Sequence, residues 1–303
     1  MNLPTGVHFF ERGWLSANNI LLLDATQAIL VDTGYHTHAK QTLGLVQRKL
    51  HDRPLTHIVN THLHSDHCGG NARLQQAYPD VLTFTPPGLA EHVRNWNPYA
   101  LSYTPTGQEC PAFALSDVLQ KDHPFDVAGL TWEVHSAPGH DPHSVLLFCP
   151  QEQILISADA LWENGFGVVF PEIEGDDAFQ EVADTLDLIE TLKPKIVLPG
   201  HGSAFTDVDG ALSRARSRLD MFVTSPEKHT VYAAKVLLKF KLLELQQIEL
   251  PKFLAWARDT EYLATLCAKH GQSLEIDAWI QQLCEAMQRS GACKIHHNII
   301  SNA

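Results

Sequence analysis

The chain lacks the features of a secreted or membrane protein. It has only six cysteines, at positions 68, 110, 149, 267, 284 and 293, and none forms a CxxC pair. Residues 1–6 have neither the basic start nor the apolar centre of an export signal. No apolar run approaches the roughly eighteen residues that a membrane-spanning helix needs. We therefore expect a cytoplasmic protein with reduced thiols.

Basic residues are also scarce. The sequence has 22 lysines and arginines against 35 aspartates and glutamates, a formal net charge of −13. Residues 1–203 hold 10 basic and 24 acidic residues, whereas residues 204–303 hold 12 and 11. Because nucleic-acid-binding proteins usually carry a basic face, this balance argues against extended contact with phosphate backbones. The sequence also has no GxSxG elbow and no complete GxGxxG fingerprint, so serine hydrolases and dinucleotide enzymes have no motif here.

The most informative segment is residues 61–70, which read THLHSDHCGG directly after an apolar run. His62 and His64 are two positions apart, so in an extended chain both rings leave the same side. A turn after them brings Asp66 and His67 round to face the first two. Imidazole and carboxylate ligands together suit zinc first, with iron and manganese as alternatives. A histidine-rich surface loop would explain this decapeptide alone, but not the segments that follow it.

Three further ligand-type residues each follow a strand-like apolar run. His140 stands in APGHDPHS, Asp159 in ISADAL and His201 in VLPGHG. Each comes where a strand is expected to end in a loop marked by glycine or proline. Loops on a rigid scaffold are where functional sites are built. One such histidine is as often structural as functional, but four segments of this kind in one chain indicate a shared metal site.

The order of these segments resembles the metallo-β-lactamase-fold hydrolase superfamily. The HxHxDH motif, a histidine in a PGH turn, an aspartate after a strand and a histidine in PGHG follow one another as in that family. Asp32, which closes the second strand of an early hairpin in AILVDTG, belongs to the same pattern. The resemblance implies an α/β fold, an αββα sandwich in which two mixed β-sheets pack face to face between outer helices.

The apolar patterning fits that architecture. Strands are expected at 19–23, 27–31, 56–60, 154–157 and 196–198, and helices at 37–50, 72–78 and 177–192.

The resemblance also implies the site, a pair of divalent metal ions of which zinc is the first choice and iron or manganese the alternatives. His62, His64 and His140 would hold one ion, Asp66, His67 and His201 the other, and Asp159 would bridge them. The nucleophile would be a metal-bridged hydroxide, because such cations lower the pKa of bound water to about 7. Asp66 would be the catalytic group that orients it, and Asp32 would support a ligand through a hydrogen bond.

Departures from known subfamilies bear on the substrate. Asp159 stands where many metallo-β-lactamases have cysteine, which disfavours antibiotic hydrolysis. Glyoxalase II is the nearest reaction analogue, but its last histidine turn usually continues with Glu-Tyr-Thr, whereas residues 202–204 read Gly-Ser-Ala and weaken the case for glutathione. The favoured function is hydrolysis of an ester, thioester or lactone of a small apolar acyl compound. Trp162, Phe166 and His143 are the candidate substrate contacts.

Two alternatives belong to other classes. A nuclease that acts on RNA through the same metals predicts a basic groove, which the acidic residues 1–203 oppose. A non-catalytic binding scaffold predicts lost ligands, whereas all seven positions are filled. We expect a small-molecule substrate and neither nucleic acid nor a membrane as partner.

Residues 225–303 are expected to form a second domain after a catalytic domain at 1–224. Helical patterns cover 232–245, the stretch after Pro251 and 276–287, with no strand alternation among them. This favours a small all-helical domain, although its last helix and turn resemble those of a winged-helix module. Its expected role is to overhang the metal cleft or to join the subunits of a homodimer.

Overall fold

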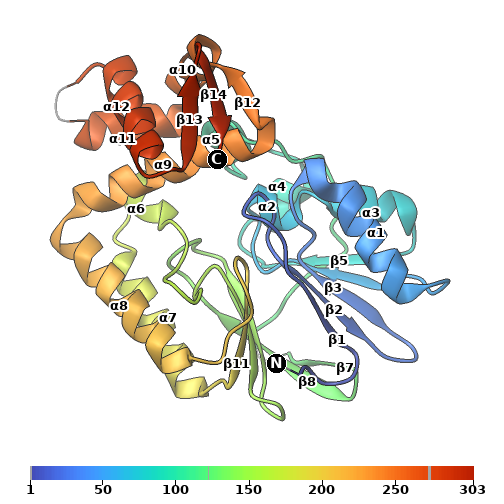
Figure 1. Cartoon of the computed structure of the whole chain (residues 1–303). Helices are drawn as coiled ribbons and strands as arrows, with labels where there is room; N and C mark the ends of the chain where they lie inside the picture. Colours follow the sequence, from blue (N-terminus) through green and yellow to red (C-terminus); the bar gives the residue numbers. More distant parts are fainter. Residues whose placement is uncertain (1, 122, 272–273) are drawn as a thin grey trace.

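Two mixed β-sheets packed face to face form the centre of the molecule (Figure 1). A computed structural model describes residues 2–121, 123–271 and 274–303. In order across the first sheet lie β1 (Val7–Phe10), β2 (Asn19–Leu23), β3 (Ala28–Val31), β4 (His57–Val59), β5 (Leu82–Thr85) and β6 (Asp117–Val118). The second sheet has the order β11 (Ile196–Pro199), β10 (Ile154–Ala158), β9 (Val145–Cys149), β8 (Leu130–Ser136) and β7 (Phe125–Val127).

The strands bury both faces because apolar side chains alternate between two cores. From the first sheet, Ile20, Ile29 and Val31 point inward and pack against Trp132 and Leu147 of the second. Their neighbours in sequence point outward, toward the helices. The outward set includes Leu21, Leu30 and Ile58.

Helices cover both outer faces. α1 (Ala39–Leu50) and α3 (Asn71–Ala77) pack on the first sheet, and α7 (Phe179–Leu192) and α8 (Val208–Thr224) pack on the second (Figure 1). Short helices lie in the connections. These are η1 (His36–His38), α2 (Ser65–Cys68), α4 (Ala90–Arg94), α5 (Tyr103–Thr106) and α6 (Phe170–Glu174). The expected αββα sandwich is therefore confirmed.

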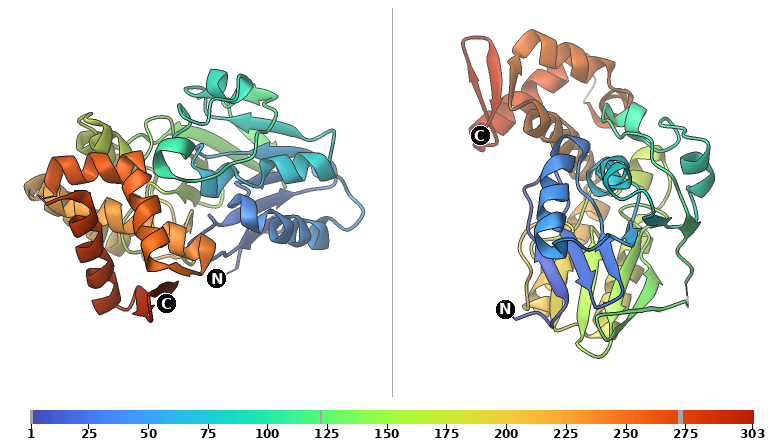
Figure 2. Two further views of the ribbon diagram at one scale, coloured as in Figure 1. Left: turned by 90° about the horizontal axis from the view of Figure 1, so that it is seen from above. Right: turned by 90° about the vertical axis from the view of Figure 1, so that its right-hand side faces the viewer.

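The C-terminal region lies at one end of the sandwich (Figures 1 and 2). Its helices are α9 (Pro226–Leu245), α10 (Leu250–Asp259), α11 (Glu261–His270) and α12 (Ile276–Arg289). A small antiparallel sheet, in the order β12 (Gln247–Glu249), β14 (Ile299–Asn302) and β13 (Cys293–His296), completes it.

The small sheet corrects the all-helical form of the prediction. Its strands are three or four residues long, too short for alternation to stand out. The turn between β13 and β14 is formed by His297 and Asn298, whose φ angles are 46° and 64°. Two consecutive positive φ values are typical of a hairpin turn, but the usual Asn-Gly or Asp-Gly signal is missing from the sequence.

The proposed boundary at residue 224 falls between two helices that contact each other. α8 ends at Thr224 and α9 begins at Pro226. Tyr232 of α9 packs on the core formed by the second sheet and its helices, with its ring centroid 5.7 Å from that of Phe222. Among the described residues, no helix is both long and apolar enough to cross a bilayer.

Candidate metal centre

The site lies where several strands end at the same edge of the sandwich. Val31 of β3 pairs in parallel with Val59 of β4, so the residues that follow them, Asp32 and the segment at 60–62, leave the sheet side by side. In the second sheet β10 and β11 are also parallel, and their ends deliver Asp159 and His201. Because β8 runs in the same direction as β10, the loop after it brings His140 to the same place.

These strand ends bring together all seven predicted ligand residues. They form three overlapping groups, in each of which the candidate ligand atoms lie within 4.8 Å of one another. The groups are His62, His64 and His140; His62, His67 and Asp159; and Asp66, His67 and His201. Five of the seven are buried, and only His64 and Asp66 are partly exposed.

In the first group, three ring nitrogens point at one another. His62 Nε2 lies 3.1 Å from His64 Nδ1, which lies 2.9 Å from His140 Nε2. The other nitrogens have partners: His140 Nδ1 donates to the carbonyl oxygen of Val168, and His62 Nδ1 lies 3.1 Å from the Thr61 hydroxyl. Since Nδ1 carries the proton in both rings, two Nε2 lone pairs face His64. A shared cation would satisfy this arrangement.

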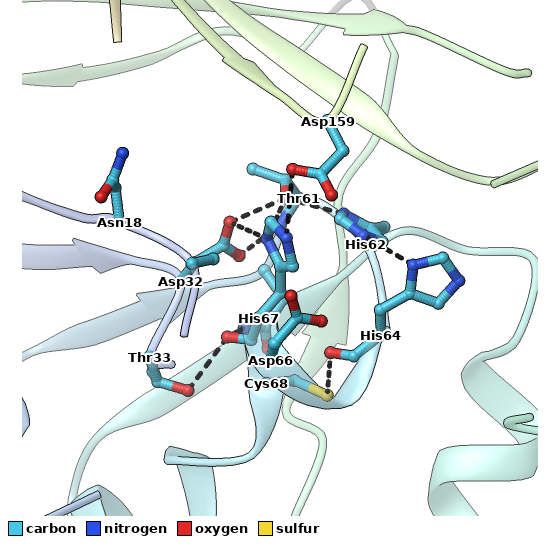
Figure 3. Close-up of polar contacts among 12 residues, drawn as sticks. Asn18, Asp32, Thr33, Thr61, His62, His64, Asp66, His67, Cys68 and Asp159 are labelled. Atoms are coloured by element: carbon cyan, nitrogen blue, oxygen red, sulfur yellow. Dashed lines mark hydrogen bonds and ion pairs between the residues drawn. The ribbon is translucent and has the colours of Figure 1, made fainter. Parts of the chain in front are cut away.

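The second group is organised by Asp32 (Figure 3). Its carboxylate accepts hydrogen bonds from the amide and hydroxyl of Thr61, at 2.9 and 2.8 Å, and lies 2.8 Å from His67 Nδ1. His67 Nδ1 therefore carries the proton, and its Nε2 has no hydrogen-bond partner among the described residues. That bare nitrogen lies 3.4 Å from an Asp159 oxygen, a repulsive contact unless a proton or a cation lies between them.

Asp159 lies between the groups. One carboxylate oxygen is 3.4 Å from His67 Nε2, and the other is 3.5 Å from His140 Nε2 and 3.8 Å from His201 Nε2. The indole N–H of Trp162 donates to Asp159 Oδ1 at 3.2 Å and orients the carboxylate. This position is suited to a ligand shared by two ions.

The electrostatics without metal also fit a cation site. Burial and the adjacent imidazoles lower the pKa of His62 well below its usual value, and burial with His140 lowers the pKa of His64 to about 4, so both rings are neutral ligands. Burial alone would lower the pKa of His67, but Asp159, Asp32 and Asp66 outweigh it and raise that pKa well above the usual value. A positive charge is thus favoured between these carboxylates.

Burial alone would raise the pKa of Asp159, but His201 and His67 outweigh it and lower that pKa well below the usual range. Asp66 shifts in the same direction: His67 and His201 lower its pKa against the effect of burial. Both carboxylates are therefore ionised. Five imidazoles and two carboxylates suit zinc first, with iron or manganese also compatible with the oxygen ligands.

Several supporting residues were not found from the sequence. Asn18 donates its side-chain amide to the carbonyl oxygens of Pro199 and Gly202, at 2.9 and 2.8 Å, and so fixes the turn that carries His201. Trp14 stacks on the His201 ring at a centroid distance of 5.4 Å while remaining 56% exposed. Neither Asn18 nor Trp14 lies in a sequence motif. Thr61, by contrast, directly precedes the first candidate ligand, and its position could have indicated a supporting role for its hydroxyl.

Two glycines are required by close packing at the site. A Cβ at Gly200 would lie 2.1 Å from Asp159 Oδ1, and a Cβ at Gly167 would lie 2.3 Å from His140 Nδ1. Gly200 belongs to the PGHG turn already singled out in the sequence.

Of the three candidate substrate contacts, one lines the cavity at the ligand groups. That cavity, of about 120 Å³, is bounded by Trp162 as well as by His64, Asp66, His140, Asp159 and His201. Phe166 does not line the cavity. Its side chain is only 1% exposed and packs edge-to-face on Phe222 in the core under α8, because the backbone directs it toward that helix. His143 lines a neighbouring cavity, which shares His64, Ser102 and Phe170 with the first.

Comparison with known proteins agrees with this geometry. The family model described as "Metallo-beta-lactamase superfamily" matches residues 12–201. A hydroxyacylglutathione hydrolase from Haemophilus ducreyi is 29% identical over 196 residues, which cover 64% of this chain and 66% of that protein. Thioesterase pkgB from Emericella nidulans is 25% identical over 65% of this chain and 49% of its own length. The chain thus spans between about half and two thirds of these relatives.

A solved structure extends the likeness to the whole fold. The crystal structure of a metallo-beta-lactamase family protein from Thermus thermophilus superposes with a TM-score of 0.58 and covers 100% of both chains at 17% identity. At that identity the likeness concerns the fold alone, including the C-terminal region.

Proposed function

Because the chain belongs to the metallo-β-lactamase superfamily, we propose that it is a hydrolase that depends on two divalent ions, zinc first, held by the seven residues of the candidate metal centre. Its substrate is an ester, a thioester or a lactone of a small apolar acyl compound. The observation that carries the proposal is the convergence of imidazole nitrogens and two ionised carboxylates on shared points at the end of the sandwich.

Bound ions would supply an activated water at neutral pH and polarise the scissile carbonyl. The chain's own residues do the rest. Asp66 is ionised, lines the cavity and is held by His201 at 3.1 Å, so it can accept a proton from the attacking water and deliver it to the leaving group. Asp32 and Thr61 keep the ring protons of His67 and His62 away from the centre.

The lining of the cavity supports an acyl substrate. Trp14, Val168 and Phe170 give it an apolar wall, and Ser102, Thr106 and Gln108 add uncharged polar groups. None of the described lining residues is a lysine or an arginine, which would be expected for a phosphodiester substrate. Two relatives bear the names hydroxyacylglutathione hydrolase and thioesterase, which favours thioesters among the three classes.

The test combines metal analysis with a substrate panel. Zinc-loaded protein is offered acyl thioesters, aryl esters, lactones, a phosphodiester and a short RNA, and hydrolysis is expected in one of the first three classes. Asp159→Ala should lower bound metal and kcat/KM together, by at least about 100-fold in kcat/KM, whereas Asp209→Ala on the exposed first turn of α8 should change neither. Hydrolysis of RNA alone, or full metal content with unchanged turnover in Asp159→Ala, would overturn the proposal.

A further inference from the structure

One face of α9 forms part of the cavity at the candidate metal centre. Tyr232, Val236 and Phe240 follow one another at intervals of four residues, so they lie on the same side of the helix, and all three line the cavity together with Leu237. We call Tyr232, Val236 and Phe240 the α9 stripe. The C-terminal region thus supplies a wall of a site whose seven candidate ligands all precede residue 202.

The α9 stripe is held firmly against the sandwich. At one end, the Phe240 ring meets the buried Tyr35 ring edge-to-face at 5.0 Å. At the other end, Tyr232 packs on Phe222, and His229 Nε2 accepts a hydrogen bond from the amide of Val169 at 3.1 Å. Contacts at both ends fix the wall, so it can select among substrates by shape and polarity.

The side chains described along the cavity beside the α9 stripe include no lysine or arginine that could pair with an anionic substrate. Ser102, Thr106 and Gln108 on the cavity lining are uncharged, and the described lining contains no lysine or arginine. Arg218 does not line the cavity: its guanidinium lies 5.5 Å from the Tyr232 ring centroid and donates to the carbonyl oxygen of Phe166 at 3.4 Å. A carboxylate lying on the stripe would lose its water without gaining a cationic side chain as partner among the described lining residues.

We propose that the α9 stripe is the acyl-binding wall and that it restricts the enzyme to uncharged, apolar acyl groups. This inference rests on the proposed function, because it names the acyl class that the same centre accepts. It assigns the C-terminal region a role in specificity: an apolar acyl chain gains contact with Tyr232 and Val236, whereas an acyl chain that ends in a charge is rejected.

The experiment compares two acyl groups of the same shape on the same uncharged thiol. Zinc-loaded protein is given the N-acetylcysteamine thioesters of 4-methylpentanoate and of succinate, whose terminal isopropyl and carboxylate groups have equal numbers of heavy atoms. The kcat/KM for 4-methylpentanoyl should exceed that for succinyl by about 100-fold or more, the scale of leaving a charge unpaired. Equal values, or a preference for succinyl, would overturn the inference while leaving the hydrolase itself in place.

Val236→Lys tests the α9 stripe directly, because it puts a cation where the succinyl carboxylate would lie. The ratio of kcat/KM for 4-methylpentanoyl to kcat/KM for succinyl should fall at least tenfold. Val223→Lys is the matched control, because it adds the same charge at a position on α8 that is 54% exposed and outside the cavity, and its preference should stay at the wild-type value. If Val236→Lys lowers metal content or the unfolding midpoint, the near-isosteric Val236→Thr replaces it, with an expected loss of about threefold. An unchanged ratio in a folded variant would contradict the proposal that the α9 stripe binds the acyl group.

A binding measurement separates failure of this inference from failure of the proposed function. The thioether in which CH2 replaces the carbonyl of the 4-methylpentanoyl thioester cannot be hydrolysed, and its binding is followed through the fluorescence of Trp14 and Trp162, which line the same cavity. Val236→Lys should raise its Kd at least tenfold, and Val223→Lys should not. Absence of turnover on the thioesters, the aryl esters and the lactones alike would defeat the proposed function. The Kd values would still decide the inference, because equal Kd values in all three proteins would overturn it.

Discussion

A single carboxylate, that of Asp32, determines which nitrogen carries the proton in two histidines of the candidate metal centre, His62 and His67. It accepts directly from His67 Nδ1, and it accepts from the Thr61 hydroxyl, which in turn faces His62 Nδ1. The Nδ1 proton of each ring is thereby held away from the centre, and Nε2 of each ring is the atom directed at it. Asp32 itself has a φ of 56°, a region that non-glycine residues rarely adopt and that marks local strain at functional sites.

Asp32→Asn should therefore weaken metal binding without touching a candidate ligand. The amide keeps the size of the carboxylate but has one acceptor oxygen, so it cannot serve both Thr61 and His67. Zinc affinity is expected to fall by about 10- to 100-fold, the usual cost of losing such a support. Metal content measured at buffered free zinc concentrations checks this, with Asp209→Asn on the exposed face of α8 as the control. Equal zinc affinities in wild type and Asp32→Asn would show that the hydrogen bonds of Asp32 do not matter for the metal.

The residues of the site divide into those that local sequence reveals and those that it does not. His62, His64, Asp66 and His67 share one short motif, and the other three ligand-type residues are marked by strand ends and turns. Trp14 contacts His201, which is 187 positions away in the sequence, only because the fold packs the two rings together, and no local sequence pattern predicts this contact. Phe166 shows the converse: it is buried in the core although Gly167 and Val168, which follow it, line the cavity. Periodicity in an irregular loop does not tell which side chain faces the cavity and which faces the core.

At the scale of elements, predictions succeeded where the hydrophobic pattern was long. The strand at residues 19–23 and the helix ending at residue 192 were placed to within two residues of their observed bounds, because buried β2 and amphipathic α7 have clear periods. The sheet formed by β12, β13 and β14 was missed because its strands are short, because the hairpin of β13 and β14 has no glycine in its turn, and because β12 pairs across a long separation, Gln247 with Ser301 for example. Pairing at such a separation depends on the tertiary structure and cannot be predicted from local sequence.

One contact between elements should be visible in the pH dependence of stability. His229 of α9 is buried, and burial lowers its pKa to about 4, so in the folded protein it remains a neutral acceptor for the Val169 amide. The unfolded chain, with a pKa near 6.5, binds the proton more readily. Stability is thus unaffected above about pH 6.5 and is lost as pH falls toward 4, by up to about 3 kcal/mol.

His229→Gln isolates this effect, because its amide oxygen can still accept from Val169 but does not titrate in that range. Chemical unfolding of both proteins from pH 4 to pH 7 in saturating zinc should give curves that diverge only below about pH 6.5, with the wild type losing more. The other histidines titrate alike in the two proteins, so their contributions cancel in the difference between the two free energies of unfolding. Parallel curves over the whole range would mean that His229 is not held neutral in the fold.

At the scale of the molecule, the candidate metal centre joins the two sheets. His62, His64, Asp66 and His67 follow β4 of the first sheet, whereas His140, Asp159 and His201 follow strands of the second. The α9 stripe of the C-terminal region closes the cavity over the same edge. A bound metal would therefore add to the apolar core, the hydrogen bonds of Asn18 and the contacts of α9 in holding the two sheets together.

Removal of the metal should accordingly destabilise the whole sandwich. An ion that binds only the folded state at 1,000 times its Kd contributes about 4 kcal/mol, which corresponds to a fall in Tm of roughly 5–15 °C for a chain of this size. Calorimetry of zinc-saturated and chelator-treated protein measures the difference, and re-addition of zinc should restore the original Tm. Asp159→Ala removes the carboxylate that lies between the groups, so its Tm should respond much less to zinc. A wild-type Tm that is the same with and without metal would contradict a centre that ties the sheets together, because ions bound at ligands from both sheets must stabilise their association.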